Sequence, residues 1–222
     1  MHNKFTDIKQ KTLSFLIKDF LSHFLTIVLI PLLVPTYLFA IILFYYPEAM
    51  PVAFTEKEKW IAVLYIFAFT TILPFIVVFI LYKLKVISTL DLEKREDRLI
   101  PQLFSLLCYI SITIFLINKY SATNALSLTM VANTVSVLFI LVITQFWKIS
   151  THSSGALGFL TILYFLLHKF PATHFNTPFI VITIMVIGVC LARLHLKVHT
   201  LGQVICGCLL GITIGTSVFY FL

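Results

Sequence analysis

Long apolar stretches separated by short polar segments run through most of the chain. A helix that crosses a bilayer needs about 20 apolar residues. Seven stretches qualify as candidates: Phe24–Tyr46, Trp60–Tyr82, Gln102–Asn118, Ala125–Trp147, Ser154–Leu167, Pro178–Leu196 and Thr200–Leu222. The fifth has about 14 residues and would rise only roughly 21 Å, short of the ~30 Å hydrocarbon layer. The pattern predicts an all-α, polytopic transmembrane bundle with six to seven spanning helices.

The first 23 residues follow a different pattern. Apolar residues recur there at helical spacing and lysines lie between them: Phe5, Ile8, Leu16 and Phe20, with Lys4, Lys9, Lys11 and Lys18. A basic amphipathic helix of this kind lies in the membrane interface. We therefore predict an interfacial segment at 1–23 and a single transmembrane domain at 24–222.

Composition removes the other classes of protein. Of 222 residues, 60% are hydrophobic and 11% are charged, whereas soluble domains carry about a quarter charged residues. A mean hydropathy of +1.04 excludes a soluble globular protein, because a chain of this size leaves much of its surface facing solvent. The net charge of +7 is explained by cationic loops that meet lipid headgroups, so no nucleic-acid partner is expected.

Small and sulfur-containing residues in the apolar stretches are interpreted as packing residues. All four cysteines lie in such stretches: Cys108, Cys190, Cys206 and Cys208. Cysteine there behaves as a small hydrophobe, and the spacing indicates neither a disulfide framework nor a thiolate metal site. Three glycines recur every four residues in the last stretch: Gly207, Gly211 and Gly215. Such a stripe permits close contact between helices.

Counting the crossings assigns each loop to a side. If all seven stretches cross, the N-terminus and loops 83–101, 148–153 and 193–199 share one face, with twelve Lys and Arg against four on the other. When the six cations that are candidates for chemistry are set aside, six remain against four. The positive-inside rule then makes this face cytoplasmic.

Three polar clusters converge on the same face, within residues 91–101, 148–155 and 193–203. Charged residues at the edge of lipid are costly and indicate function. Phosphate is bound by planar Arg forks, Lys charges and backbone N–H groups at a helix start. The clusters supply these cations: Arg95, Arg98, Lys148 and Arg193.

The spacing predicts how these groups meet. Arg95 and Arg98 are three apart and share a helical face. Ser153 or Ser154 can cap the fifth helix, and Gly155 lets a ligand approach its backbone.

The last cluster needs a turn. Arg193 and His199 cannot share a face of one straight helix, because six residues rotate about 240°. A turn between them would bring both to a common site. His199 and Gln203, four apart, would then stack at the start of the last helix.

At this point the chain resembles the type 2 phosphatidic acid phosphatase superfamily. Arg193, His199 and Gln203 are similar to its signature Ser-Arg-x5-His-x3-Asp. Ser154 and Gly155 are similar to the core of its Pro-Ser-Gly-His signature. The basic run ending at Pro101 stands where Lys-x6-Arg-Pro would be.

The signatures are degenerate, and the whole chain resembles a divergent bacterial branch. Four residues depart from the family pattern: Ala192 replaces Ser, Ala156 replaces His, Gln203 replaces Asp, and Asp91 stands in place of Lys. Further segments carry the resemblance: Pro31–Tyr37, Phe146–His152 and Ala192–Leu194.

The resemblance implies metal-independent hydrolysis of a lipid phosphate or isoprenoid (di)phosphate through a phosphohistidine, with no cofactor, in the bacterial inner membrane. His199 would be the nucleophile, Gln203 would orient it, and His152 would be the acid. The phosphoryl oxygens would be held by Arg95, Arg98, Lys148, Arg193 and the amides near Ser154 and Gly155. The active-site face would be cytoplasmic.

Two other readings stay open. His195 and His199 are spaced like two zinc ligands on one helix, with His152 as a third, which would suit a zinc-dependent membrane hydrolase. A neutral Gln203 can orient an imidazole but cannot stabilise its positive form, and a comparable Asp-to-Asn change in the Ser-His-Asp triad costs about 10⁴ in rate. A phospholipid-binding or transport protein without catalysis is therefore the second alternative.

Overall fold

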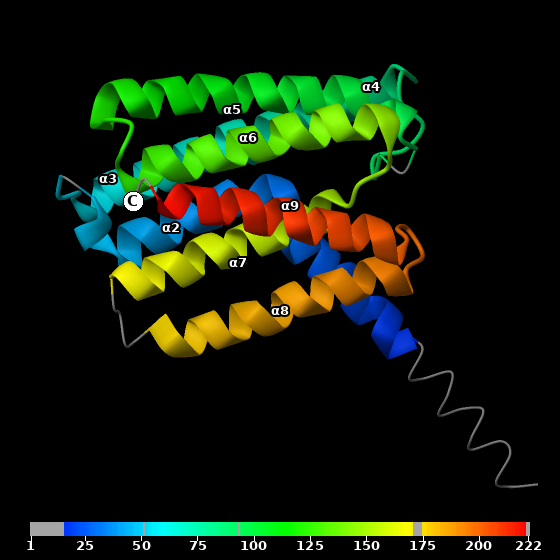
Figure 1. Cartoon of the computed structure of the whole chain (residues 1–222). Helices are drawn as coiled ribbons and strands as arrows, with labels where there is room; N and C mark the ends of the chain where they lie inside the picture. The colour runs from blue at the N-terminus through cyan, green and yellow to red at the C-terminus, as the bar shows by residue number, and fades with distance from the viewer. Residues whose placement is uncertain (1–15, 51, 93, 171–174, 221–222) are drawn as a thin grey trace, which may run out of the picture.

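The chain forms a bundle of long helices in the computed structural model, which describes residues 16–50, 52–92, 94–170 and 175–220 (Figure 1). Within these ranges there are helices and no strands. Residues 16–28 form the first helix. The long helices that follow are α2 (Val34–Tyr45), α3 (Glu56–Phe67), α4 (Leu73–Lys83), α5 (Leu99–Tyr120), α6 (Ala125–Phe146), α7 (Thr151–Lys169), α8 (Asn176–His195) and α9 (Leu201–Phe219). Short turns of helix join them: η1 (Pro31–Leu33), η2 (Pro47–Ala49), η3 (Ala68–Ile72) and η4 (Glu96–Arg98).

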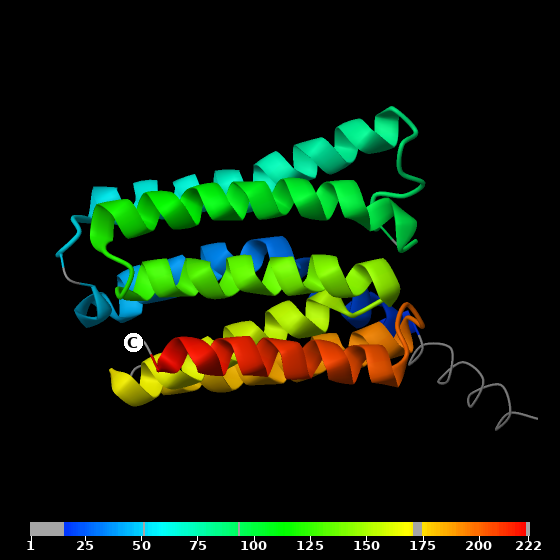
Figure 2. The same cartoon turned by 45° about the horizontal axis from the view of Figure 1, so that its top comes forward.

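Successive passes run in opposite directions, so the loops gather at two ends. The α4–α5, α6–α7 and α8–α9 connections lie at the same end as the start of the 16–28 helix, on the right in Figure 1, and Figure 2 shows the same grouping. The end of α9 lies at the other end of the bundle. The three polar clusters therefore share one end, as the loop count predicts.

Each predicted stretch corresponds to helix, and six helical segments are long and apolar enough to cross a membrane. The one predicted stretch that is not among these six is the fifth, which corresponds to α7. Its 19 residues rise about 28 Å. The prediction of about 14 residues is wrong because the helix begins at Thr151 and includes the polar residues as far as Ser154. These residues lower its hydropathy, while its length matches the neighbouring passes.

The stretch Phe24–Tyr46 is not one helix. Ile30 has φ −62° and ψ 131°, since a residue before proline is pushed out of the helical region, and Pro31 follows it. The Tyr37 hydroxyl donates to the Val28 carbonyl oxygen at 2.8 Å across this break. Helix 16–28 continues through the predicted boundary between 23 and 24, and residues 1–15 lie outside the described ranges, so the division into 1–23 and 24–222 stays a prediction.

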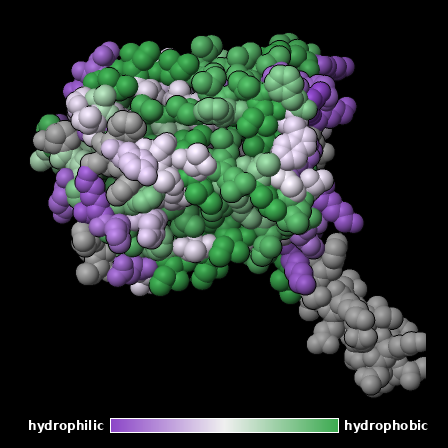
Figure 3. Space-filling model, viewed as in Figure 1, coloured by the Kyte–Doolittle hydropathy of each residue, from purple (hydrophilic) through white to green (hydrophobic). Residues whose placement is uncertain are grey.

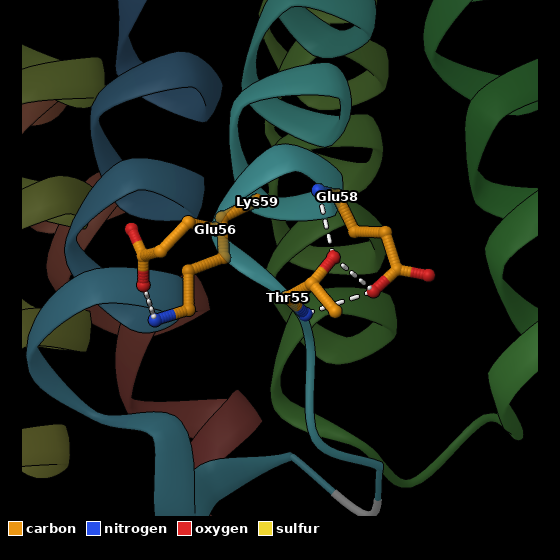
Figure 4. A network of polar contacts seen from close by, with 4 residues as sticks. All are labelled: Thr55, Glu56, Glu58 and Lys59. Atoms are coloured by element: carbon orange, nitrogen blue, oxygen red, sulfur yellow. Dashed lines mark hydrogen bonds and ion pairs between the residues drawn. The ribbon is translucent and has the colours of Figure 1, made fainter.

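The surface matches a bilayer. On the face drawn in Figure 3, hydrophobic residues cover the middle and hydrophilic residues gather toward both ends. At the end remote from the polar clusters, a capping box begins α3, in which the Thr55 N–H donates to Glu58 Oε2 at 2.8 Å and the Thr55 hydroxyl accepts from the Glu58 N–H (Figure 4). Lys59 Nζ lies 2.7 Å from Glu56 Oε1 beside it. This end is built from local polar contacts of a helix start.

The glycine stripe packs α9 against α7, which confirms its interpretation as a packing feature. A Cβ added at Gly207 would lie 2.5 Å from the Ser150 carbonyl oxygen, and one at Gly211 would overlap the Ser154 carbonyl oxygen. Side chains at these positions would force the two backbones apart. The absence of a Cβ therefore sets the distance between α7, which carries His152, and α9, which begins directly after His199 and Thr200.

Candidate active site

Arg193 and His199 are separated by a turn, as predicted. Helix α8 ends at His195, Lys197 turns the chain with φ 55°, and Thr200 caps α9. Lys148 and Arg193 both act electrostatically on His199. The loop thus brings residues from two helices and the α6–α7 connection to one place.

Gln203 fixes the orientation of His199. The Nδ1 atom of His199 lies 3.0 Å from Gln203 Oε1, and the Thr200 backbone N–H donates to the same oxygen at 3.2 Å. A backbone N–H can only donate, so the atom it meets is the amide oxygen, and Nδ1 must supply the proton of the other bond. The Nε2 atom of His199 consequently keeps its lone pair.

His199 is a neutral imidazole in a positive environment. The side chain is 6% exposed. Burial lowers the pKa of His199 to about 4, the Gln203 hydrogen bond opposes this shift, and the charges of Arg193, Arg98 and Lys148 lower the pKa further. At neutral pH the site therefore combines an unprotonated nitrogen with three nearby cations, which is the arrangement that a nucleophile for a phosphate anion requires.

Arg98 is built into the site and Arg95 lies at its edge. Arg98 is buried and donates from Nε to the Leu92 carbonyl oxygen at 2.8 Å and from Nη1 to that of Ile149 at 3.4 Å. Arg95 donates to the Gln145 carbonyl oxygen at 2.9 Å. These bonds hold the loop before α5 against the connection between α6 and α7, with Arg98 alone of the pair acting on His199.

The start of α7 differs from the prediction. Ser150 is the cap, with its Oγ accepting from the Ser153 N–H at 3.4 Å, so a cap at Ser153 or Ser154 is wrong. The Ser154 N–H donates to the Ser150 carbonyl oxygen at 3.1 Å. Gly155 faces Pro31, whose Cβ lies 3.4 Å from the position of an added Cβ. The Ser154 N–H is therefore used within the helix, and the first-turn N–H groups of Thr151 and His152 are the ones without an intrahelical acceptor.

His152 joins the cluster from the first turn of α7. It interacts electrostatically with Arg193, His199 and Arg98, and its ring is hydrogen-bonded to the backbone of Thr26. Its Nε2 is buried and has no hydrogen-bond partner among the described residues. The sequence indicated His152 as a site residue. It did not indicate the contact with the Thr26 backbone, because that contact depends on how helix 16–28 packs in the bundle.

The zinc-hydrolase alternative requires His195 and His199 to lie on one helix, and the structure does not place them there. His195 is the last residue of α8 and His199 precedes α9, so the two do not lie on one helix. His195 Nε2 instead lies 4.0 Å from Asp19 Oδ1. In the described ranges no three His, Cys, Asp or Glu residues are grouped so that they could hold a metal ion.

An all-α bundle with a buried imidazole among cations offers a site that suits an anionic ligand. The family model of the PAP2 superfamily matches residues 102–222, more than half of the chain. The chain belongs to the PAP2 superfamily, whose members are phosphatases, and this supports a phosphatase-type function in general. Neither the search of curated proteins nor that of solved structures returned a match.

Proposed function

We propose that the protein is an integral-membrane, metal-independent phosphatase that hydrolyses a lipid phosphate or isoprenoid (di)phosphate through a phosphohistidine on His199. The observation that carries the proposal is the His199 imidazole, which is held by Gln203 with Nε2 unprotonated and lies among Arg98, Lys148 and Arg193. The family supports hydrolysis of a phosphoester; the nucleophile, the substrate and the membrane location belong to the proposal.

In the first step the Nε2 lone pair of His199 attacks phosphorus and the bond to the leaving oxygen breaks. Charge spreads over the phosphoryl oxygens in the transition state, and preorganised cations stabilise it. Arg98, Lys148 and Arg193 supply that charge, with the N–H groups of Thr151 and His152 as further donors. Arg95 contributes from the edge of the site.

His152 gives the leaving oxygen its proton. Its ring lies beside the charges of Arg193 and Arg98, and a bound phosphate, as an anion, offsets that positive charge and favours the protonated ring. His152 can then carry a proton to a lipid alkoxide, a task that suits an imidazole. In the second step water attacks the phosphohistidine and gives a proton to the now neutral His152. Phosphate leaves with the new oxygen, His199 Nε2 recovers its lone pair, and His152 is protonated again.

The side of the membrane is also part of the proposal. The polar clusters and the start of helix 16–28 share one end of the bundle, and the loops at this end carry most of the cations. The positive-inside rule favours the cytoplasmic side of a bacterial inner membrane for this end.

The experiment is phosphate release from a panel of lipid phosphates by purified protein, with and without a chelator. We expect release to persist with the chelator, to disappear in His199→Ala, and radiolabelled phosphate to be trapped on the wild-type protein in an acid-labile bond. Thermal melting of His199→Ala serves as the folding control. Full turnover in a folded His199→Ala protein would end the phosphohistidine mechanism.

A second candidate function is favoured by one residue. Gln203 leaves the imidazolium of a phosphohistidine without a compensating carboxylate, which suits a protein that binds a phospholipid without cleaving it. Binding of phosphatidic acid vesicles that requires Arg193, without phosphate release from any lipid in the panel, would select this function.

A further inference from the structure

Two cysteines face each other beside the site, in a place that the proposed mechanism does not use. Cys190 on α8 and Cys208 on α9 are free thiols, both partly buried, with their sulfur atoms 3.8 Å apart. A disulfide bond is about 2 Å long. The sulfurs therefore have to approach by less than 2 Å to bond. The neighbouring Cys206 on α9 is exposed and is not part of this contact.

The pair connects two helices that otherwise touch little. Helix α9 packs along its glycine stripe on α7, while α8 packs mainly on α7 and contacts α9 far less. Gly188 of α8 also lies against Leu25 of helix 16–28. Figure 1 shows α8 at the edge of the bundle. A link between Cys190 and Cys208 would thus tie the helix that carries Arg193 to the helix that carries Gln203.

A chain of polar contacts leads from the pair to the proposed nucleophile. Cys190 shares a hydrogen bond with Ser153, and Ser153 Oγ lies 2.8 Å from Ser150 Oγ. The Ser150 N–H donates to the Gln203 carbonyl oxygen at 3.3 Å. Gln203 in turn holds His199. A change at the sulfurs therefore alters hydrogen bonds at both the cap of α7 and the start of α9.

We propose that Cys190 and Cys208 form a redox-active pair that a membrane-soluble quinone oxidises to a disulfide, tethering α8 to α9 and slowing the active site. Both S–H bonds break, one S–S bond forms, and the two electrons and two protons reduce the quinone to its hydroquinone. Cys190 lies five residues before the end of α8, roughly 7.5 Å along its axis. An apolar oxidant dissolved in the bilayer reaches that depth.

The slowing follows from geometry. Bond formation draws the sulfurs together and removes both thiol hydrogens, so the hydrogen bond between Ser153 and the Cys190 sulfur changes. Arg193 lies three residues after Cys190, one turn further along α8. A misplacement of about 1 Å in a positioned group can cost 10²-fold in rate, and we expect at least a ten-fold loss of turnover.

The disulfide is tested by counting thiols, which does not depend on activity. Purified full-length protein in lipid nanodiscs is treated with a short-chain benzoquinone, and the remaining thiols are alkylated with maleimide after denaturation. We expect wild type and the matched control Cys206→Ser each to lose two alkylation sites and to yield a linked 190–208 peptide after digestion. Cys208→Ser should lose none. Four alkylated thiols in wild type after oxidation, or a pair that persists in Cys208→Ser, would overturn the proposal.

The effect on the site is measured on the same samples and rests on the proposed phosphatase function. Oxidation should slow phosphate release at least ten-fold in wild type and Cys206→Ser, reversibly with a thiol reductant, and should leave Cys208→Ser unchanged. A complete disulfide without a change in rate would refute the coupling. If the reduced protein releases no phosphate, the proposed function fails, and the thiol count still decides the disulfide.

Discussion

At the scale of the residue, His199 and Gln203 decide what chemistry is available. Their contact could be predicted from the sequence, because residues four apart at a helix start face each other. The six-residue spacing from Arg193 likewise requires a turn before His199. The cap of α7 was not readable. Ser150, Ser153 and Ser154 are all competent caps, and only the tertiary contacts with Gln203 and α9 select Ser150. The contacts of Arg98 with the Ile149 backbone and of His152 with the Thr26 backbone join distant segments and likewise leave no local signal.

His199 gives the pH dependence of the free enzyme. Burial and the neighbouring cations hold its pKa at about 4, so the nucleophilic form persists well below the ordinary value of 6.5. The acid limb of kcat/KM, which reports the free enzyme, should therefore fall with an apparent pKa near 4. Nitrogen NMR of labelled His199 should show neutral imidazole at pH 5.5. A limb and a titration near 6.5 would contradict the buried geometry.

The same depressed pKa affects stability. The unfolded chain binds a proton at His199 near pH 6.5, whereas the folded chain does so only near pH 4. The contribution of His199 to the free energy of unfolding is thus fully present above pH 6.5 and declines as the pH falls from 6.5 to about 4. His199→Ala should flatten that part of the stability profile.

Gln203→Glu tests the missing carboxylate. Glu has the same length as Gln, so one carboxylate oxygen can accept from both the Thr200 N–H and His199 Nδ1 in the observed geometry. The added charge stabilises the imidazolium and makes Nε2 more basic, and we expect kcat to rise by about ten-fold and the acid limb to move to higher pH. Gln203→Ala should lower kcat and loosen the α9 cap. Steady-state kinetics on one lipid phosphate compare wild type, Gln203→Glu and Gln203→Ala. A Gln203→Glu variant slower than Gln203→Ala would contradict the idea that a carboxylate at this position assists His199.

At the scale of the element, the apolar stretches predicted where helices lie but not where they end. The break at Ile30 comes from Pro31, which the count of apolar residues ignores. The extra turns of α7 come from polar residues that the same count assigns to a loop. The glycine stripe was more informative. Its four-residue period predicts close contact with another helix, and the structure confirms that contact with α7.

Gly211→Ala should separate α7 from α9. The new methyl would overlap the Ser154 carbonyl oxygen and lie 2.7 Å from the Gly158 nitrogen, and both are backbone atoms that cannot rotate away. Overpacking of this kind costs about 1–3 kcal/mol, so the melting temperature in detergent should fall, and turnover should fall with it because His152 and His199 move apart. Gly202→Ala is the matched control on the same helix, since its methyl meets only Trp147 Cζ2 at 4.0 Å. Equal melting temperatures for both variants would show that the α7–α9 spacing adapts.

At the scale of the whole molecule, antiparallel order is what assembles the site. Lys148, His152, Arg193, His199 and Gln203 come from the region that matches the family, 102–222, while Arg98 and the Thr26 backbone come from before it. The segments before α5 therefore contribute contacts to the cluster around His199. The site also requires α7 to run the full length of the bundle. If α7 stopped short, α8 would start at the end where Lys148 lies and would carry Arg193 to the opposite end.

The number of passes can be measured directly by cysteine labelling. Single cysteines at the exposed positions 57, 94, 122 and 197, on a cysteine-free background, alternate between the two ends of the bundle. In intact cells a charged maleimide should label 57 and 122, and it should label 94 and 197 only after permeabilisation, because the cation-rich end faces the cytoplasm. The reverse pattern in all four would place the site on the outer side. Labelling of 197 together with 122 would mean that α7 does not cross, since α6 and α8 alone return the chain to the side from which it came.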